Sequence, residues 1–135
     1  MRHLLLTIVV ITIFQTSFSQ KSQARLLVFT PEKEKISITQ QHLTDFVKKW
    51  YWIVIEFSEL KVESLDNSYF LLAKDETNKR TFAFRLTKRD GNFYLTPSPY
   101  VNICTCDCME LANFIIEKGE IMGCRKSKHA VVSGL

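Results

Sequence analysis

The sequence predicts an α+β fold, in which one N-terminal helix packs on an antiparallel β-meander and a cysteine-stapled β-hairpin follows at the C-terminus. Three observations lead to this prediction. The segment from Thr39 to Trp50 has apolar residues at helical spacing, and later segments change to an alternation with a period of two. The dipeptide Asp90-Gly91 marks a tight turn between two such segments. All four cysteines lie in the last third of the chain.

Residues 1–19 have the composition of a secretory signal peptide. Arg2 and His3 form a short polar start, and Leu4 to Phe14 is an apolar run. Ser17 and Ser19 suit the −3 and −1 positions of signal peptidase, so we expect cleavage after Ser19. The apolar run is shorter than the roughly 20 residues that span a bilayer. We therefore expect an exported protein, periplasmic, in the cell envelope or secreted, with no transmembrane anchor after cleavage.

The remaining segment, 20–135, is long enough for a single small α+β domain and too short for two. The full chain carries a net charge of +4, and the loss of Arg2 with the signal peptide leaves a mild +3. Basic and acidic residues are mixed along most of the chain, unlike the dense basic stripe of a nucleic-acid-binding protein. We therefore expect no nucleic-acid partner.

The predicted helix begins after Thr39. The Thr39 hydroxyl suits the N-cap because it can accept an orphan backbone N–H. Ile38 and Leu43 form a hydrophobic staple around this cap. His42 lies on the polar side of the helix, where we expect a solvated residue and not a catalytic base. The apolar face consists of Leu43, Phe46, Val47 and Trp50.

Three segments after the helix predict strands. Residues 53–57 and 81–87 alternate with a period of two, and 69–73 is an apolar stretch entered through Asp66-Asn67. The alternation over 81–87 predicts a strand with one buried face, which holds Phe82, Phe84 and Leu86.

The Asp90-Gly91 turn sets a register for the next strand. A two-residue type I′ turn needs positive φ at both central residues, which suits Asp-Gly. If Arg89 faces Asn92, then Leu86 faces Leu95, and the turn and the hydrophobic pattern agree.

The C-terminal third predicts one more hairpin and then a tail. Leu111 to Ile116 and Glu120 to Gly123 flank the turn-like Lys118-Gly119. The residues from about 125 to the end mix charge, Ser and Gly, and predict a loose tail.

One helix followed by an antiparallel meander resembles, in outline, the helix-on-sheet topology of cystatin-like and NTF2-like domains. The resemblance covers roughly residues 37–96 and concerns topology alone. No motif of either family is present, so the resemblance implies no functional residues.

The four cysteines are candidates for disulfide bonds because export favours oxidation. They are Cys104, Cys106, Cys108 and Cys124. Each possible full pairing joins Cys124 to one cysteine of the cluster and leaves the other two to bridge each other. On a straight strand Cys104 and Cys108 would lie about 13 Å apart, too far for a disulfide, so full oxidation requires a bend. We expect Cys106 or Cys108 to form the long bridge, which ties the last hairpin to the segment after Pro99.

Two alternative functions use the same cysteines. The cluster could hold zinc or copper(I), with Cys124 or His129 completing a tetrahedral site. This C-x-C spacing resembles the thiolate clamps of metallothionein-like proteins over five residues. A thiol–disulfide exchanger would instead need an exposed thiolate, and Arg125, Lys126 and Lys128 could supply positive charge beside Cys124. Structural disulfides are favoured, because oxidation competes with metal outside the cytosol.

The sequence contains no G-x-S-x-G, H-E-x-x-H or phosphate-binding glycine motif. We therefore expect a non-enzymatic exported binding or accessory domain, without a cofactor, whose partner is a protein or a small-molecule ligand. Trp50, Tyr51 and Trp52 form an aromatic run at the end of the helix and are the candidate pocket residues.

Overall fold

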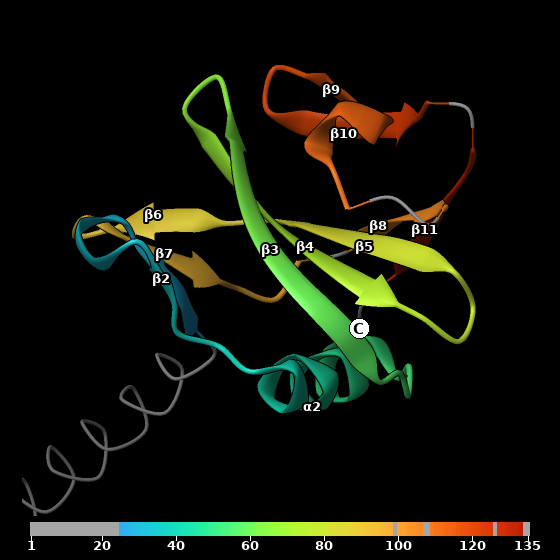
Figure 1. The fold of residues 1–135 in the computed structure, drawn as a ribbon, viewed down its shortest axis with the longest axis horizontal. Coiled ribbons are helices and arrows are strands. Elements are labelled where there is room, and N and C mark those ends of the chain that lie inside the picture. Colours follow the sequence, from blue (N-terminus) through green and yellow to red (C-terminus); the bar gives the residue numbers. More distant parts are fainter. Residues whose placement is uncertain (1–24, 99, 107–108, 126, 134–135) are drawn as a thin grey trace, which may run out of the picture.

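The computed structural model describes residues 25–98, 100–106, 109–125 and 127–133. The predicted signal peptide, Cys108 and Lys126 lie outside these ranges. The fold is α+β, with a helix, α2 (Gln40–Tyr51), and antiparallel strands in three sheets (Figure 1). In the described segments, no helix is long and apolar enough to cross a membrane.

The largest sheet has five strands in the order β11-β8-β5-β4-β3. These strands are β3 (Phe57–Leu65), β4 (Ser68–Asp75), β5 (Arg80–Arg85), β8 (Tyr100–Thr105) and β11 (Lys128–Ser133). A second sheet has the order β2-β1-β7-β6 and consists of β1 (Leu26–Thr30), β2 (Lys35–Ile36), β6 (Thr87–Arg89) and β7 (Asn92–Leu95). The last sheet is the hairpin of β9 (Phe114–Glu117) and β10 (Glu120–Cys124). Two 3-10 turns, η2 (Pro31–Lys33) and η3 (Leu111–Asn113), precede β2 and β9.

The helix begins after Thr39, as predicted. Thr39 Oγ1 accepts a hydrogen bond from the His42 N–H over 3.2 Å, and His42 Nδ1 accepts one from the Thr39 N–H over 3.4 Å. These reciprocal bonds form a capping box, so His42 stabilises the helix start although it is exposed. The helix ends at Tyr51 because Trp52 adopts a left-handed conformation, with φ of 58°.

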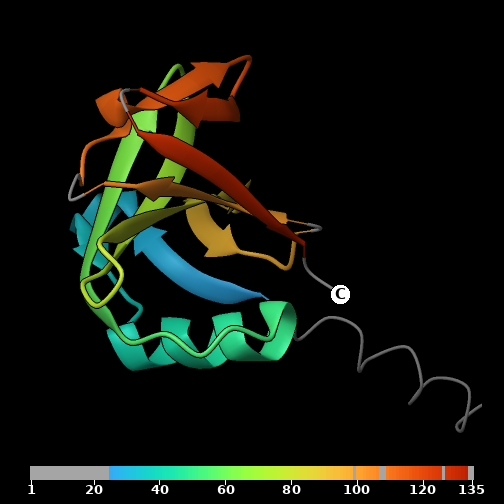
Figure 2. The same ribbon diagram turned by 90° about the vertical axis from the view of Figure 1, so that its right-hand side faces the viewer.

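The main core lies between the helix and the sheets (Figure 2). The buried face of α2 supplies Leu43, Phe46 and Val47, and Trp50 packs at the margin of this cluster. The sheets contribute Val28, Leu71, Phe82, Phe84, Leu86, Phe93, Leu95, Val101 and Ile103. The predicted Asp90-Gly91 turn is confirmed: both residues have positive φ, and Arg89 pairs with Asn92.

The other face of the five-stranded sheet is buried as well, which corrects the prediction for 81–87. Thr81, Phe82, Ala83 and Phe84 are all buried. Ala83 points away from the main core and joins a second cluster, formed by Phe70, Leu72, Cys104, Leu111 and Phe114. This cluster exists because the β9–β10 hairpin and its preceding residues cover the sheet on that side (Figure 2).

Two further predictions are wrong. Residues 53–56 alternate in burial, with Ile55 buried and Val54 exposed, but β3 begins only at Phe57. Residues 53–56 connect α2 to β3 along the edge of the core, so their side chains alternate in burial although they form no strand. The loose tail expected from about 125 is also wrong over Lys128–Ser133, which pair with β8 as the antiparallel strand β11. Residues 128–131 are exposed, which suits an edge strand, because one of its sides faces solvent.

Candidate functional site

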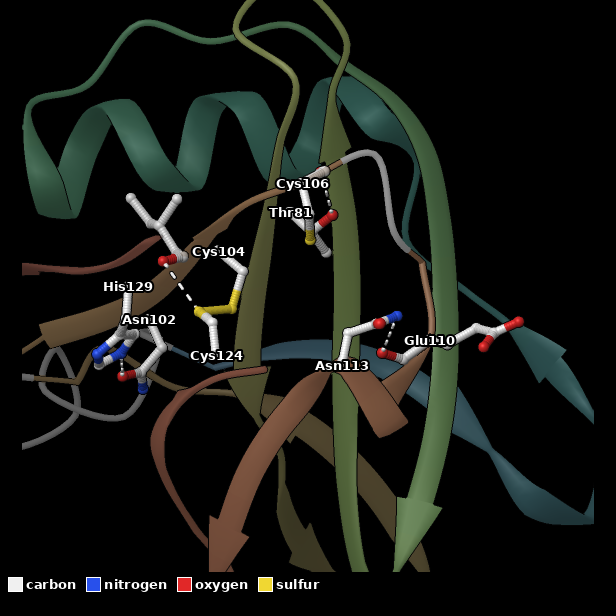
Figure 3. Close-up of a disulfide and its surroundings, with 9 residues drawn as sticks. Thr81, Asn102, Cys104, Cys106, Glu110, Asn113, Cys124 and His129 are labelled. Carbon is white, nitrogen blue, oxygen red and sulfur yellow. Dashed lines mark hydrogen bonds between the residues drawn. A yellow bond between two sulfur atoms is a disulfide. The ribbon is translucent and has the colours of Figure 1, made fainter. Parts of the chain in front are cut away.

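A disulfide joins Cys104 in β8 to Cys124 at the end of β10, with 5.8 Å between their Cα atoms (Figure 3). Cys104 is fully buried and Cys124 is half-buried. Cys104 belongs to the second cluster, and Cys124 packs against that cluster from the β9–β10 hairpin. The bond therefore ties this hairpin to the five-stranded sheet and lies inside the packed protein.

The long bridge uses Cys104, and not Cys106 or Cys108 as the sequence analysis expected. Strand β8 stays in the sheet as far as Thr105, with Cys104 opposite both Thr81 and His129. This register aims the Cys104 side chain at the hairpin. The chain bends directly afterwards, where the Cys106 N–H donates to the Cys104 carbonyl over 3.0 Å. Cys106 is half-buried and is also disulfide-bonded.

Among the described residues, the cysteines do not present a soft-metal site in this oxidised form. His129 lies opposite Cys104, but its Nε2 is 3.0 Å from Asn102 Oδ1 (Figure 3). The sulfurs of Cys104 and Cys124 are bonded to each other and are not thiolate ligands. Among the described residues, no three His, Cys, Asp or Glu side chains gather to hold a metal ion.

A groove of about 560 Å³ opens where the two larger sheets diverge. Strand β5 continues through Leu86 into β6, and the Leu86 N–H donates to the Tyr69 carbonyl of β4 over 2.8 Å. Strand β8 pairs with this long strand from Thr81 to Ala83, and β7 pairs with it from Thr87 to Arg89. The groove lies between these two pairings, so it is a consequence of one strand serving two sheets.

The groove is lined by groups of mixed character. Aromatic rings come from Tyr51, Tyr69 and Phe93, and polar side chains from Thr87, Ser98 and Asn102. Lys88 lies at its margin and forms no ion pair with a described carboxylate. These groups can accept a ligand that has an apolar ring or chain together with polar or anionic substituents.

The start of β10, directly after the β9–β10 turn, lines one side of the groove with Glu120 and Ile121. Arg85 of β5 and Glu120 of β10 make an exposed ion pair there. A Cβ atom on Gly119 would lie 2.8 Å from Ser68 Oγ and 3.1 Å from Arg85 Nη2. With φ of 75°, Gly119 also has a backbone conformation that other residues adopt at a cost. The turn thus approaches the sheet closely because it carries glycine.

Tyr51 supplies a hydroxyl to the groove. Its oxygen accepts a hydrogen bond from the Ser98 N–H over 3.3 Å, which leaves its own proton to donate. Burial raises the pKa of Tyr51 above 10.0, and the bond from Ser98 opposes that shift. The hydroxyl is therefore a neutral donor at physiological pH.

The three candidate pocket residues separate in the structure. Tyr51 lines the groove, while Trp50 is half-buried with its ring centroid 6.4 Å from that of Phe46. Trp52 is 75% exposed and lines a different, shallow hollow with Val54. Successive residues at a helix end point in different directions, so adjacency in sequence does not imply one pocket.

Sequence reasoning missed most groove residues, including Arg85, Ser98 and Asn102. No motif marks them, because they come together only through the shared strand and the hairpin turn. The break in the alternating pattern at 96–98 is the one local signal nearby.

Comparisons with protein-family models, curated proteins and solved structures found no match for this chain.

Proposed function

We propose that the protein is an exported, non-enzymatic binding domain that takes a small ligand of mixed polarity in the groove between its two larger sheets. The groove is the observation on which this proposal rests. It combines aromatic rings, neutral hydrogen-bonding groups and the cation of Lys88 in one space. That combination matches a binding site, which needs shape and a few placed polar groups.

Two features support export. The N-terminal leader-like segment has the charge and apolar run of a signal peptide. The Cys104–Cys124 disulfide is the kind of bond that persists in oxidising compartments. We propose a periplasmic, cell-envelope or secreted location on these grounds.

The finer architecture belongs to the same proposal. The helix packed on the sheets supports a cystatin-like or NTF2-like outline, and the disulfide supports a role for the C-terminal hairpin as a stapled cover. In this view the hairpin buries the second cluster and holds Glu120 and Ile121 at the groove wall.

The two cysteine-based functions have less support. A metal clamp needs thiolates, and Cys104 and Cys124 are joined to each other. A disulfide exchanger needs an accessible sulfur, and Cys104 is fully buried. A structural role for the bridge agrees with both observations.

Calorimetric titration of the exported protein with 8-anilinonaphthalene-1-sulfonate tests the proposal. This probe has aromatic rings and one anionic group, which suit the groove rings and Lys88. We expect saturable binding at one site, and Ser98→Trp should weaken it at least tenfold by filling the groove. The Ser98 backbone bond to Tyr51 does not involve the replaced side chain.

Thr77→Trp is the matched control, since Thr77 is exposed in the turn between β4 and β5. Binding that Ser98→Trp leaves intact would place the probe elsewhere and contradict the proposal. Catalytic turnover lost on mutation of one polar groove residue would contradict the non-enzymatic part.

A further inference from the structure

Trp52 occupies a position where neither the backbone conformation nor the degree of burial favours tryptophan. Its φ of 58° is left-handed, a conformation in which glycine or asparagine usually ends a helix. A bulky side chain in this conformation is a genuine outlier and costs stability. Its ring is 75% exposed, so burial does not compensate. Such an outlier points to a role outside the fold itself.

The side chain of Trp52 forms one wall of a shallow hollow of about 470 Å³. The other lining residues are Asp45, Lys48, Lys49 and Val54. Val54 is 76% exposed and adds a second apolar side chain to the lining of the hollow. Asp45, Lys48 and Lys49 lie seven, four and three residues before Trp52, so they share one face over the last two turns of α2. None of these residues lines the groove between the sheets.

The rim of the hollow carries an excess of positive charge. Lys48 and Lys49 are both exposed and form no ion pair with a described carboxylate. The Lys49 Nζ lies 5.2 Å from the centroid of the Trp50 ring. Asp45 supplies one opposing charge and accepts a hydrogen bond from Gln41 Nε2 over 3.0 Å. An incoming group that is both apolar and acidic would complement this surface.

We infer that this hollow binds an acidic segment of a partner protein, which inserts an apolar side chain between Trp52 and Val54 and sets carboxylates against Lys48 and Lys49. Tryptophan is among the residues most enriched at the energetic centre of protein interfaces. A lipid surface fits less well, because one ring and one valine in a concave hollow bury little area in a bilayer. The inference adds a second binding surface to the groove and does not depend on it.

Selection from a library of displayed peptides against the exported full chain tests this inference. We expect enriched sequences that place Asp or Glu beside a large apolar residue. A synthetic copy of one enriched peptide should bind at least tenfold more weakly to Trp52→Gly and to the double variant Lys48→Glu/Lys49→Glu. Leu65→Ser removes an exposed apolar side chain on β3 and should leave the affinity unchanged.

Trp52→Gly also separates binding from folding. Glycine adopts the left-handed conformation freely, so the Tm of this variant should rise by about 2–4 °C while peptide binding is lost. A fall in Tm would mean that Trp52 stabilises the fold, and would overturn the inference. Selection of no peptides, or of peptides without acidic residues, would also overturn it. The inference would likewise be overturned if the protein bound phosphatidylglycerol vesicles but no peptide, and if Trp52→Gly abolished that vesicle binding.

Discussion

Asp75, at the end of β4, is a buried carboxylate with a full set of partners. The Arg80 side chain donates to its Oδ2 from Nε over 3.0 Å and from Nη2 over 2.8 Å. Asn78 donates from its backbone N–H and from its side-chain amide. Burial would raise the pKa of Asp75, but these hydrogen bonds and the Arg80 charge outweigh it and hold the pKa below 3.8.

This arrangement predicts a pH-dependent contribution of Asp75 to stability. The folded-state pKa lies below the unfolded value, so the stabilisation is full above about pH 4 and is lost as the pH falls through the folded pKa. Asp75→Asn should cost about 2 kcal/mol near pH 7, because it leaves the Arg80 charge without its partner. Urea denaturation should show the difference from the unmutated protein shrinking near pH 2.

Asp90→Asn is the matched control, since Asp90 is exposed in a turn that asparagine also suits. Its free energy of unfolding should change by less than about 0.5 kcal/mol. An equal loss in both variants would mean that the Asp75 contacts do not stabilise the fold.

At the scale of elements, the C-terminal hairpin depends on covalent attachment. Strands β9 and β10 form a separate two-stranded sheet, and an isolated hairpin is marginal in water. Among the described residues, its contacts with the rest of the protein include the second cluster, the exposed Arg85–Glu120 pair and a bond at the start of η3. There the Leu111 N–H donates to Glu63 Oε2 over 2.6 Å.

Removal of the Cys104–Cys124 bridge should therefore loosen the hairpin first. In the chain-entropy account, a bridge across 20 residues contributes about 3 kcal/mol. Hydrogen exchange of Cys104→Ser/Cys124→Ser should show lost amide protection in β9 and β10, while Phe82 and Phe84 in β5 stay protected. Glu120→Gln, which removes only the exposed ion pair, should cost less than about 1 kcal/mol.

Uniform loss of protection in β5 and β9 would show that the hairpin and the main core unfold as one unit. That result would contradict the view of the bridge as a local tie.

Elements fixed by local chemistry were predictable from sequence. The Thr39 cap and the Asp90-Gly91 turn depend on residues within a few positions of one another, and both are confirmed. Strand β11 was not predicted, because its pairing with β8 is set by a distant partner and only Val131 and Val132 among its residues favour a strand. The second cluster was hidden for a similar reason, since Ala83 looks like part of a solvent face until the residues of the C-terminal hairpin cover it.

The candidate site likewise has features that the local sequence indicates and features that depend on the pairing of distant strands. The cysteines were identified, but the choice of Cys104 for the long bridge follows from the register of β8 in the sheet. The groove depends on β5 and β6 being one strand with β8 at one end and β7 at the other. Neither Ser98 nor Asn102 indicates from its residue type alone that it lies in this groove.

On the scale of the whole molecule, the five-stranded sheet is covered on both faces. The groove lies where this sheet separates from the four-stranded sheet. The helix and main core support one side of this opening through Tyr51, and the stapled hairpin supports another through Glu120. A ligand in the groove would contact residues of the helix, both larger sheets and the hairpin together.

Amide chemical-shift mapping with 8-anilinonaphthalene-1-sulfonate tests directly whether a ligand binds in the groove between the two larger sheets. We expect progressive shifts at groove positions such as Leu86, Ser98 and Asn102, and we expect Ser98→Trp to remove them. Thr77→Trp should leave the same shifts in place. Shifts confined to the Lys48–Val54 hollow or to the β9–β10 hairpin, with none at the groove, would contradict ligand binding in the groove.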